Sequence, residues 1–297
     1  MPDDDAVSVV VVTWNALPWL ERCLESVRGH ETVVVDHGST DGTVELVRER
    51  FPEVQLVVQE NRGMGGGNNT GMRATGGRYW FLLNADAWVV GDGLERLVAF
   101  ADSHPRAAVV GPRLRNPDGS LQRSVRGEPT LWRLATEYLG LRKLAPRTDL
   151  FNAFYGGGFA HDEVREVESL YGAALLVRRE ATEGVGLFDE DFFMFSEETD
   201  WLSRFRAAGW EVLFYPGAEV VHVGGAAHGG GLYVENLRGL LRFFAKHRGP
   251  REAARARLLL LWSLRLRTLI FRGERRRRYR DGVRFLESGD VEALLGR

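Results

Sequence analysis

The chain has 297 residues, of which 44% are hydrophobic, and its formal net charge is -2. A chain of this length can bury a large core, as one big domain or as two modest ones. The near-neutral charge gives no whole-protein case for nucleic-acid binding, which normally needs a clear basic excess, so no nucleic-acid partner is expected. Cys23 is the single cysteine, which excludes an intramolecular disulfide and fits a reducing cytosol.

The N-terminal residues and the apolar runs bear on membrane insertion. Asp3 to Asp5 precede the first apolar run, which is not the pattern of a secretory signal. No uninterrupted apolar stretch in the sequence reaches the ~18 residues that a membrane span requires. We therefore expect a cytoplasmic chain without a transmembrane helix.

Apolar runs alternate with amphipathic segments through the first third of the chain. They predict strands at residues 7–12, 32–35, 54–58 and 79–83, and helices at 18–27, 42–51 and 68–75. A loop is expected at 61–67, where glycine and asparagine prevail. This βαβαβαβ order predicts an α/β fold, with a mainly parallel sheet and helices on both of its faces.

The second half of the chain is less regular. Its patterns predict helices at 93–103, 198–208, 232–247 and 250–271, and strands at 107–114, 171–178, 210–215 and 218–221. Residues 116–119, Asn-Pro-Asp-Gly, have the composition of a turn. Residues 144–166 are rich in glycine, aspartate and aromatic residues without a clear period, and we interpret them as a mobile loop over a site.

Polar residues follow the predicted strands, whose carboxyl ends meet at the edge of a parallel sheet where nucleotides bind. Asp36 ends the second strand, and its carboxylate could accept a hydrogen bond from a base imide or a ribose hydroxyl. The alternative is a capped turn that leads into a helix. Asn61 to Gly71 contain five glycines in eleven residues, which would let backbone amides approach a diphosphate. The segment lacks the lysine of a P-loop.

Asp86 and His222 are candidate metal ligands. Asp86 follows the fourth strand in the sequence Asn84-Ala-Asp, and a carboxylate placed there can hold a divalent cation that bridges two phosphates. His222 follows the apolar run 218–221 and would lie at a strand end. Each residue has a structural alternative, which is an Asx turn for Asp86 and a buried, hydrogen-bonded ring for His222.

Three carboxylates, Glu197, Glu198 and Asp200, stand at the start of a predicted helix behind an aromatic stretch. Ser196 as an N-cap and the helix dipole would explain negative charge there on structural grounds alone. A carboxylate cluster beside apolar bulk also suits a general base. Like charges raise one another's pKa and the dipole lowers it, so both explanations stay open.

Five segments carry a resemblance to a known family, and they occur in the right order. The segments are VVVTWN, VVDHGSTDGT, ENRG with GGNNTG, FLLNAD, and FFMFSEETDW followed by AAGW. Over about residues 7–225 the chain resembles the inverting glycosyltransferases of family 2, which have the GT-A fold. NPDGSLQRS at 116–124 and YGAALLVRRE at 171–180 are similar to the rhamnosyltransferase-type members.

The resemblance implies a domain organisation and a set of binding residues. The GT-A domain would cover residues 1–230, as a nucleotide-binding half at about 1–115 and an acceptor half at about 116–230, and a basic helical extension would cover 231–297. The implied nucleotide contacts are Thr13, Asn15, Asp36, Asn61, Gly63, Asn69 and Asn84. Asp86 and His222 match the family's metal ligands, with Asn84 in the first position of the Asp-x-Asp motif, so a Mg²⁺ or Mn²⁺ cofactor is implied.

The resemblance also implies an activity. Glu198 matches the general base, and Glu197 and Asp200 stay in contention. The sugar would come from a nucleotide-diphosphate donor, dTDP-rhamnose first and a UDP-sugar second. It would go to a hydroxyl of a glycan or lipid-linked acceptor in cell-envelope or exopolysaccharide synthesis. The alternative is a catalytically silent nucleotide-sugar or glycan-binding protein on the same fold.

The C-terminal segment is strongly basic. Between residues 248 and 280, twelve arginines face only Glu252 and Glu274. One interpretation is an interfacial helix that makes peripheral contact with anionic lipid at the inner face of the membrane. The other is an apolar helix packed on the domain or in a homodimer, with solvated arginines around it.

Overall fold

The computed structural model describes residues 7–224 and 232–294, which divide into two compact units. The sheet unit comes from residues 1–126, 160–191 and 197–229, and the helical unit from 127–159, 192–196 and 230–297. The expected boundary at residue 230 lies outside the described residues. Residues 127–159, which the sequence placed in the acceptor half, group with the C-terminal helices.

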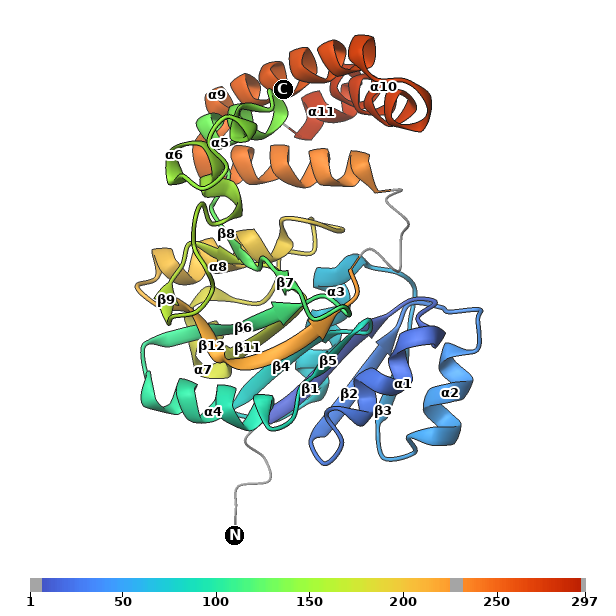
Figure 1. Ribbon diagram of the computed structural model, residues 1–297. Coiled ribbons are helices and arrows are strands. Elements are labelled where there is room, and N and C mark those ends of the chain that lie inside the picture. The colour runs from blue at the N-terminus through green and yellow to red at the C-terminus, as the bar shows by residue number, and fades with distance from the viewer. Residues whose placement is uncertain (1–6, 225–231, 295–297) are drawn as a thin grey trace. The chain divides into compact units, whose positions relative to one another are not determined.

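A central sheet forms the core of the sheet unit, with the strand order β3-β2-β1-β4-β11-β6-β12-β5 (Figure 1). The strands on this path are β1 (Val7–Thr13), β2 (Glu31–Asp36), β3 (Gln55–Val58), β4 (Tyr79–Asn84), β5 (Ala87–Val89), β6 (Ala107–Arg115), β11 (Ala174–Arg178) and β12 (Glu211–His222). Two short strands extend it, as β7 (Leu121–Gln122) pairs with β6 and β9 (Arg165–Glu166) pairs with β12. A separate pair consists of β8 (Val125–Arg126) and β10 (Ser169–Leu170).

The first four strands pair in parallel, as the sequence predicted. β11 then runs antiparallel between β4 and β6, so the sheet is mixed beyond β4. The two runs predicted at 210–215 and 218–221 are one strand, β12, with a register shift between Tyr215 and Glu219. This irregularity surrounds Pro216, which lacks the N–H that a regular ladder needs.

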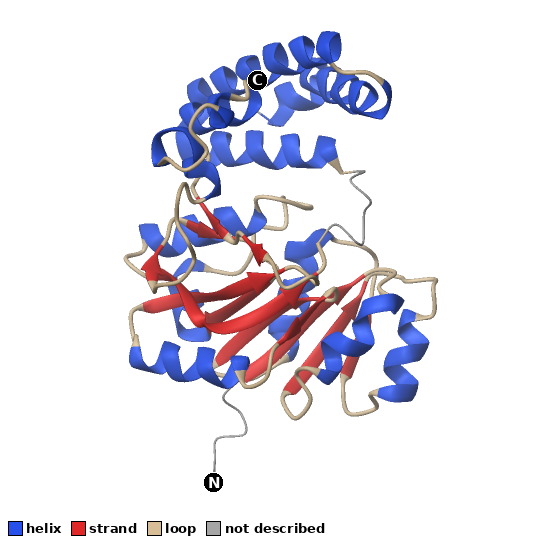
Figure 2. Ribbon diagram, viewed as in Figure 1, coloured by secondary structure: helices blue, strands red, loops and turns tan. Residues whose placement is uncertain are grey.

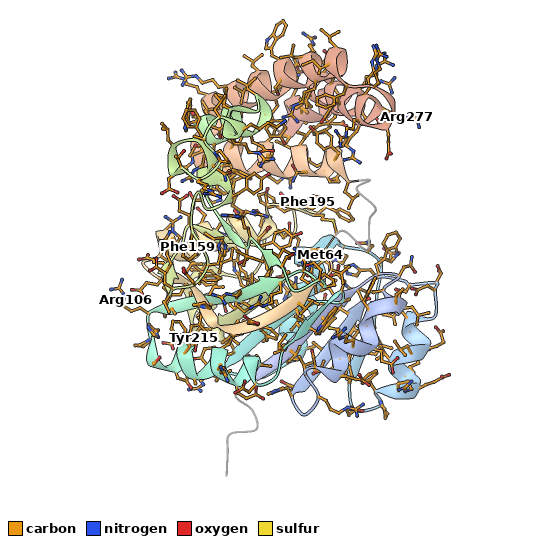
Figure 3. All side chains as sticks on the ribbon, in the orientation of Figure 1. Met64, Arg106, Phe159, Phe195, Tyr215 and Arg277 are labelled. Atoms are coloured by element: carbon orange, nitrogen blue, oxygen red, sulfur yellow. The ribbon has the colours of Figure 1, made fainter. Side chains whose placement is uncertain are left out.

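Helices cover both faces of the sheet (Figure 2). The helices of the sheet unit are α1 (Leu17–Glu25), α2 (Thr43–Arg50), α3 (Gly63–Ala74), α4 (Gly93–Ser103), α7 (Arg179–Val185) and α8 (Glu197–Ala207). Val9 and Val11 of β1 share one buried cluster with α1, α2 and α4, whereas Val10 and Val12 face α3. All seven residues of β1 are buried, because a strand covered on two faces needs apolar side chains in both directions. On α4, Phe100 stacks on Tyr215 with ring centroids 4.1 Å apart. Figure 3 labels Tyr215 among the side chains of the sheet unit.

The prediction of a loop at residues 61–67 is wrong, because helix α3 already begins at Gly63. Its glycines pack against strands. A Cβ on Gly67 would lie 2.7 Å from Val12 Cγ1, and one on Gly71 would collide with Val10. The glycines therefore let the helix axis approach β1, and packing rather than loop flexibility explains their number.

The helical unit contains α5 (Leu131–Tyr138), α6 (Asp149–Asn152), α9 (Tyr233–Ile270), α10 (Gly273–Glu287) and α11 (Gly289–Leu294), with 3₁₀ turns at Leu141–Lys143 and Ala153–Tyr155. Within the segment 144–166, which we interpreted as a mobile loop, residues 149–155 are thus helical. α9 is interrupted at Gly249, whose φ is 82°. This break lies between the two helices predicted at 232–247 and 250–271. Leu134, Leu241, Phe244 and Leu264 belong to the core of the unit. Among the described residues, no helix has the length and apolar character needed to cross a membrane.

Candidate active site

Asp86 and His222 lie together at the carboxyl edge of the sheet. β4 ends at Asn84, and Asp86 follows before β5, whose first residue Ala87 pairs with His222 in antiparallel register. Asp86 Oδ1 is 3.3 Å from His222 Nε2, and Asp86 Oδ2 accepts from the Gly224 amide at 3.2 Å. Burial would raise the pKa of Asp86, but the hydrogen bond and charge of His222 and the Gly224 amide outweigh it and lower the pKa. The two predicted metal ligands therefore meet.

His222 faces a polar group at each ring nitrogen. Its Nδ1 lies 2.7 Å from Gln122 Oε1, while Nε2 faces the Asp86 carboxylate and lies 3.4 Å from Asn84 Nδ2. A neutral imidazole has a single N–H and cannot donate to both oxygens. The arrangement suits either an imidazolium or a ring that directs its Nε2 lone pair toward a cation held with Asp86. Among the described residues, no group of three or more His, Cys, Asp or Glu side chains forms a larger metal-binding cluster.

Glu197 and Glu198 begin helix α8, and the Oε2 atom of each is inaccessible to solvent. Burial raises the pKa of Glu197 well above its ordinary value, and the negative charge of Glu198 adds to the effect. No described residue offers a hydrogen bond to Glu197 Oε2. Glu198 packs beside Gly172, where a Cβ would lie 3.5 Å from Glu198 Cγ. Two adjacent carboxylates in such surroundings share a proton more readily than they both ionise.

Asp200 has different surroundings from the glutamates. It is fully buried and accepts from Arg204 Nε at 2.9 Å, one turn along α8. The same guanidinium donates to the carbonyl oxygens of Val185 and Leu187. Asp200 thus orients an arginine that ties α8 to the segment after α7.

Tyr171 lies between two pairs of residues, Asp86 with His222 and Glu197 with Glu198. It was not identified from the sequence. Burial raises the pKa of Tyr171, and the negative charges of Glu198, Asp86 and Glu197 contribute to the same shift. All three carboxylates therefore lie within electrostatic reach of one phenol. Arg126 lies over the ring, 5.4 Å from its centroid. A polar aromatic residue between β10 and β11 gives no sequence signal of this role, because only the tertiary structure assembles its neighbours.

The ends of β1 and β2 carry three of the predicted nucleotide contacts. Thr13 pairs with Asp36 across the strands, and its buried Oγ1 has no hydrogen-bond partner among the described residues. The Asp36 carboxylate accepts from the Gly38 and Ser39 amides and from the Ser39 hydroxyl. Asn15, with φ of 51°, accepts from the Thr40 amide through its Oδ1. Asp36 and Asn15 thus shape the loop after β2, as the capped-turn alternative for Asp36 expected. The Thr13 hydroxyl is left available to bond a ligand.

The remaining predicted contacts divide into two groups. Asn84 lies beside Val12 in register and reaches His222, so it belongs to the same edge. Asn61 accepts from the Gly63 amide and starts helix α3. Asn69 is buried and holds the segment after α7, because it bonds both backbone groups of Phe188 and donates to Glu190. The side chain of Asn69 is therefore engaged in hydrogen bonds within the protein.

Comparisons with known proteins agree with this geometry. Residues 8–161 match the family model described as glycosyl transferase family 2. The chain is 36% identical over 239 residues to an N-acetylglucosaminyl-diphospho-decaprenol L-rhamnosyltransferase of Mycobacterium tuberculosis, which covers 73% of this chain and 76% of the relative.

Solved structures show the same fold at lower identity. A mannosyltransferase from Pyrobaculum calidifontis in complex with GDP-Man and Mn²⁺ is 19% identical, with a TM-score of 0.57, and the match covers 100% of this chain and 90% of that one. GalNAc-T7 with UDP, GalNAc and Mn²⁺ is 17% identical, with a TM-score of 0.56 over 84% of this chain. The chain spans about half of that protein, 51% of its length. The fold is therefore GT-A, and the chain belongs to glycosyltransferase family 2, where it is similar to the rhamnosyltransferases.

Proposed function

We propose that the protein is an inverting glycosyltransferase that uses the edge formed by β1, β2, β4 and β12 for the donor and the start of α8 for the base. The observation that carries the proposal is the position of Tyr171, whose ring centroid lies 5.5 Å from that of His222, while the next residue, Gly172, packs against Glu198. Metal ligands and a proton acceptor must lie this close if one sugar is to contact both.

Glu198 is the proposed base. Burial and the negative charge of Glu198 raise the pKa of Glu197, and Asp200 is bonded by Arg204, so we assign the role of base to Glu198 among the three carboxylates. Its carboxylate would take the proton of an acceptor hydroxyl as that oxygen attacks the anomeric carbon. The new bond forms on the face opposite the nucleotide, the bond from the anomeric carbon to the diphosphate oxygen breaks, and the configuration inverts.

Asp86 and His222 fit a divalent cation. They provide one carboxylate oxygen and one imidazole nitrogen 3.3 Å apart, a mixed donor set that suits Mn²⁺ better than Mg²⁺. Donor phosphate oxygens and water would complete the coordination. When bound, the cation would supply positive charge that stabilises the departing diphosphate.

The rhamnosyltransferase relative supports a choice of donor and acceptor. We propose dTDP-rhamnose as the first donor to test and a UDP-sugar as the second. The relative's name specifies an N-acetylglucosaminyl-diphospho-decaprenol acceptor, which supports a lipid-linked glycan here and a role in cell-envelope synthesis.

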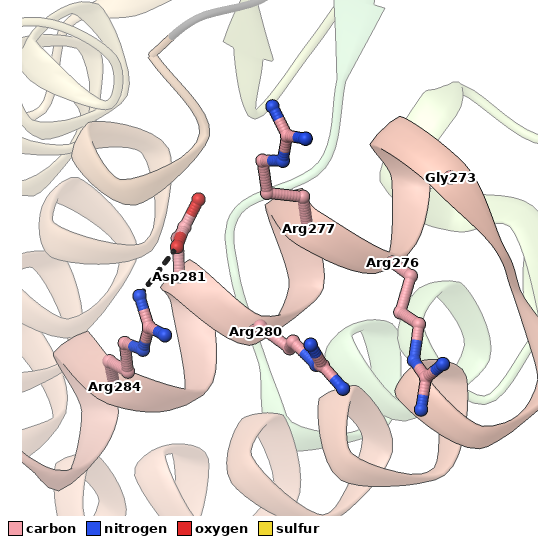
Figure 4. A pocket seen from close by; sticks show the side chains of 6 residues that line it. All are labelled: Gly273, Arg276, Arg277, Arg280, Asp281 and Arg284. Atoms are coloured by element: carbon pink, nitrogen blue, oxygen red, sulfur yellow. Dashed lines mark hydrogen bonds and ion pairs between the residues drawn. The ribbon is translucent and has the colours of Figure 1, made fainter.

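A lipid-linked acceptor would place the enzyme at a membrane surface. The second half of α9 has a face suited to binding such a surface. Five apolar side chains recur on it at helical spacing and are 52–79% exposed: Leu258, Trp262, Leu266, Leu269 and Ile270. On the following helix α10, Arg276, Arg277, Arg280, Arg284 and Asp281 line a pocket with Gly273 (Figure 4). Exposed apolar side chains with arginines nearby in the chain match the chemistry of an anionic bilayer. A homodimer on this face is the competing outcome.

The deciding experiment mixes purified protein with dTDP-rhamnose or UDP-sugars, a short-chain lipid diphosphate GlcNAc acceptor and Mn²⁺, and detects the product by mass spectrometry. We expect transfer from one donor, and loss of metal-dependent donor binding in Asp86→Ala. Donor binding without transfer or hydrolysis would favour the catalytically silent alternative. Failure to bind any donor would contradict the proposal.

A further inference from the structure

The segment NPDGSLQ, residues 116–122, forms a hairpin that ends beside His222. Its strands β6 and β7 pair with Leu114 opposite Gln122. The turn is closed by the Asn116 amide, which donates to the Ser120 carbonyl, and by the Gly119 amide, which donates to the Asn116 carbonyl. Asp118 accepts from both the amide and the hydroxyl of Ser120. Five consecutive residues therefore fix the place of Gln122.

The hydrogen bonds of Gln122 determine which way its amide faces. Nε2 is 3.2 Å from the backbone carbonyl oxygen of His222, which can only accept, and 2.9 Å from Asn116 Oδ1. Nε2 must therefore lie on that side, and Oε1 must face the imidazole, 2.7 Å from His222 Nδ1. Because Oε1 can only accept, Nδ1 must carry a proton and donate it.

This bond has a consequence for the other ring nitrogen. With the proton held on Nδ1, the neutral ring has its lone pair on Nε2, the nitrogen that faces Asp86 Oδ1 at 3.3 Å. A carbonyl or carboxylate partner on the far nitrogen is the usual device by which proteins orient a metal-binding histidine. Gln122 also bonds the backbone of the same residue, so it restrains both the ring and the strand end that carries it.

We propose that Gln122 is a positioning residue for the cation site: it fixes the Nδ1–H form of His222 and aims Nε2 at a divalent cation shared with Asp86. The inference rests on the proposed function of that pair. It also gives a physical purpose to the Asn-Pro-Asp-Gly-Ser turn, because Asn116 and the turn hold the Gln122 amide in the orientation that His222 requires.

Two variants of the same position separate this role from a purely structural one. Gln122→Leu and Gln122→Glu both lose the two N–H donors that bond Asn116 and the His222 carbonyl. Only Gln122→Glu keeps an acceptor for His222 Nδ1–H. If Gln122 merely fastens the hairpin, Gln122→Glu should bind Mn²⁺ at least as weakly as Gln122→Leu, because it sets a negative charge against two acceptors.

The experiment measures the Kd of Mn²⁺ by electron paramagnetic resonance on the full chain in the presence of dTDP. We expect Gln122→Leu to bind Mn²⁺ about 10–100-fold more weakly than wild type, and Gln122→Glu to remain within about threefold. Gln55→Leu is the matched control, since Gln55 is exposed on β3, several strands away from β12 in the sheet, and it should keep the Mn²⁺ affinity of wild type.

A second measurement needs no variant at position 122. Two-dimensional ¹⁵N NMR of the histidine rings in metal-free protein, with His222 assigned by its loss in His222→Asn, should show Nδ1 protonated. An Nδ1 without a proton, equal Kd values for wild type and Gln122→Leu, or equally weakened leucine and glutamate variants would each overturn the role of Gln122. Wild-type protein that does not bind Mn²⁺ would instead overturn the cation site itself, and the role of Gln122 with it.

Discussion

The ring of Tyr171 lies against the ring of His222, with centroids 5.5 Å apart and planes inclined at 56°. The contact joins Tyr171, which lies near Glu197 and Glu198, to His222, which lies beside Asp86. It adds to the restraint that the hydrogen bond of Gln122 places on the His222 ring. An aromatic ring, rather than its hydroxyl, makes this contact.

Tyr171→Phe should therefore retain the Mn²⁺ affinity of wild type, whereas Tyr171→Ala should weaken it by roughly tenfold, because loss of a supporting contact frees the His222 ring. Titration of Mn²⁺ in the presence of nucleotide measures both. Equal losses in the two variants would show that the phenol, and not the ring, carries the effect.

Glu198→Gln should lower the turnover rate by a factor on the order of 10²–10⁴ and leave donor binding intact. The amide keeps the shape of the side chain but cannot accept a proton. Initial rates and donor Kd values give the comparison. Asp200→Asn serves as the contrast: it breaks the bond to Arg204 and should lower the melting temperature. Retained turnover in Glu198→Gln would remove it as the base.

Glu197 should make stability depend on pH. Its pKa is raised in the folded protein, by burial first and by Glu198 second, so the native state holds a proton that the unfolded state releases near pH 4.3, approximately the ordinary pKa of glutamate. Stability should then fall as pH rises from that value toward the folded pKa. Glu197→Gln keeps a neutral side chain and should flatten this part of the profile of melting temperature against pH. An unchanged slope would contradict the raised pKa.

Gly67→Ala should destabilise the sheet unit by about 1–3 kcal/mol, because its Cβ would overpack a filled interface. The added carbon would lie 2.7 Å from Val12 Cγ1 and 2.9 Å from His37 Nε2. Gly76→Ala is the control, since a Cβ there meets nothing within 4 Å. Urea unfolding of the two variants should separate them, and equal stabilities would show that α3 can move away from β1 at little cost.

The α9 face should bind anionic vesicles. Wild type should sediment with vesicles that contain phosphatidylglycerol but not with pure phosphatidylcholine, and added salt should weaken the binding because the arginine charges are screened. Trp262→Ser with Leu269→Ser should reduce sedimentation several-fold, since both side chains are more than 60% exposed and would insert into the interface. If these changes instead alter the mass in solution and leave vesicle binding unchanged, the face joins two copies of the chain.

The sequence by itself determined the parallel half of the sheet and the family. Runs such as 7–12 are apolar at every position, so a strand covered on both faces is the arrangement that buries them. The short motifs at the strand ends indicate the family. Asp86 and His222 could be named in advance because strand ends of one sheet share an edge.

Only the tertiary structure decided which polar groups meet there. The sequence could not distinguish glycines that cradle a phosphate from glycines that let α3 approach Val10 and Val12, because both need the absence of a Cβ. Asp200 and Arg204 are four residues apart on one helix, a spacing that the sequence contains, but the burial that raises the pKa of Glu197 depends on how α8 is packed. Tyr171 and Gln122 reach His222 across 51 and 100 positions of the chain, and contacts at such separations follow from the packing of whole strands and helices rather than from any local pattern.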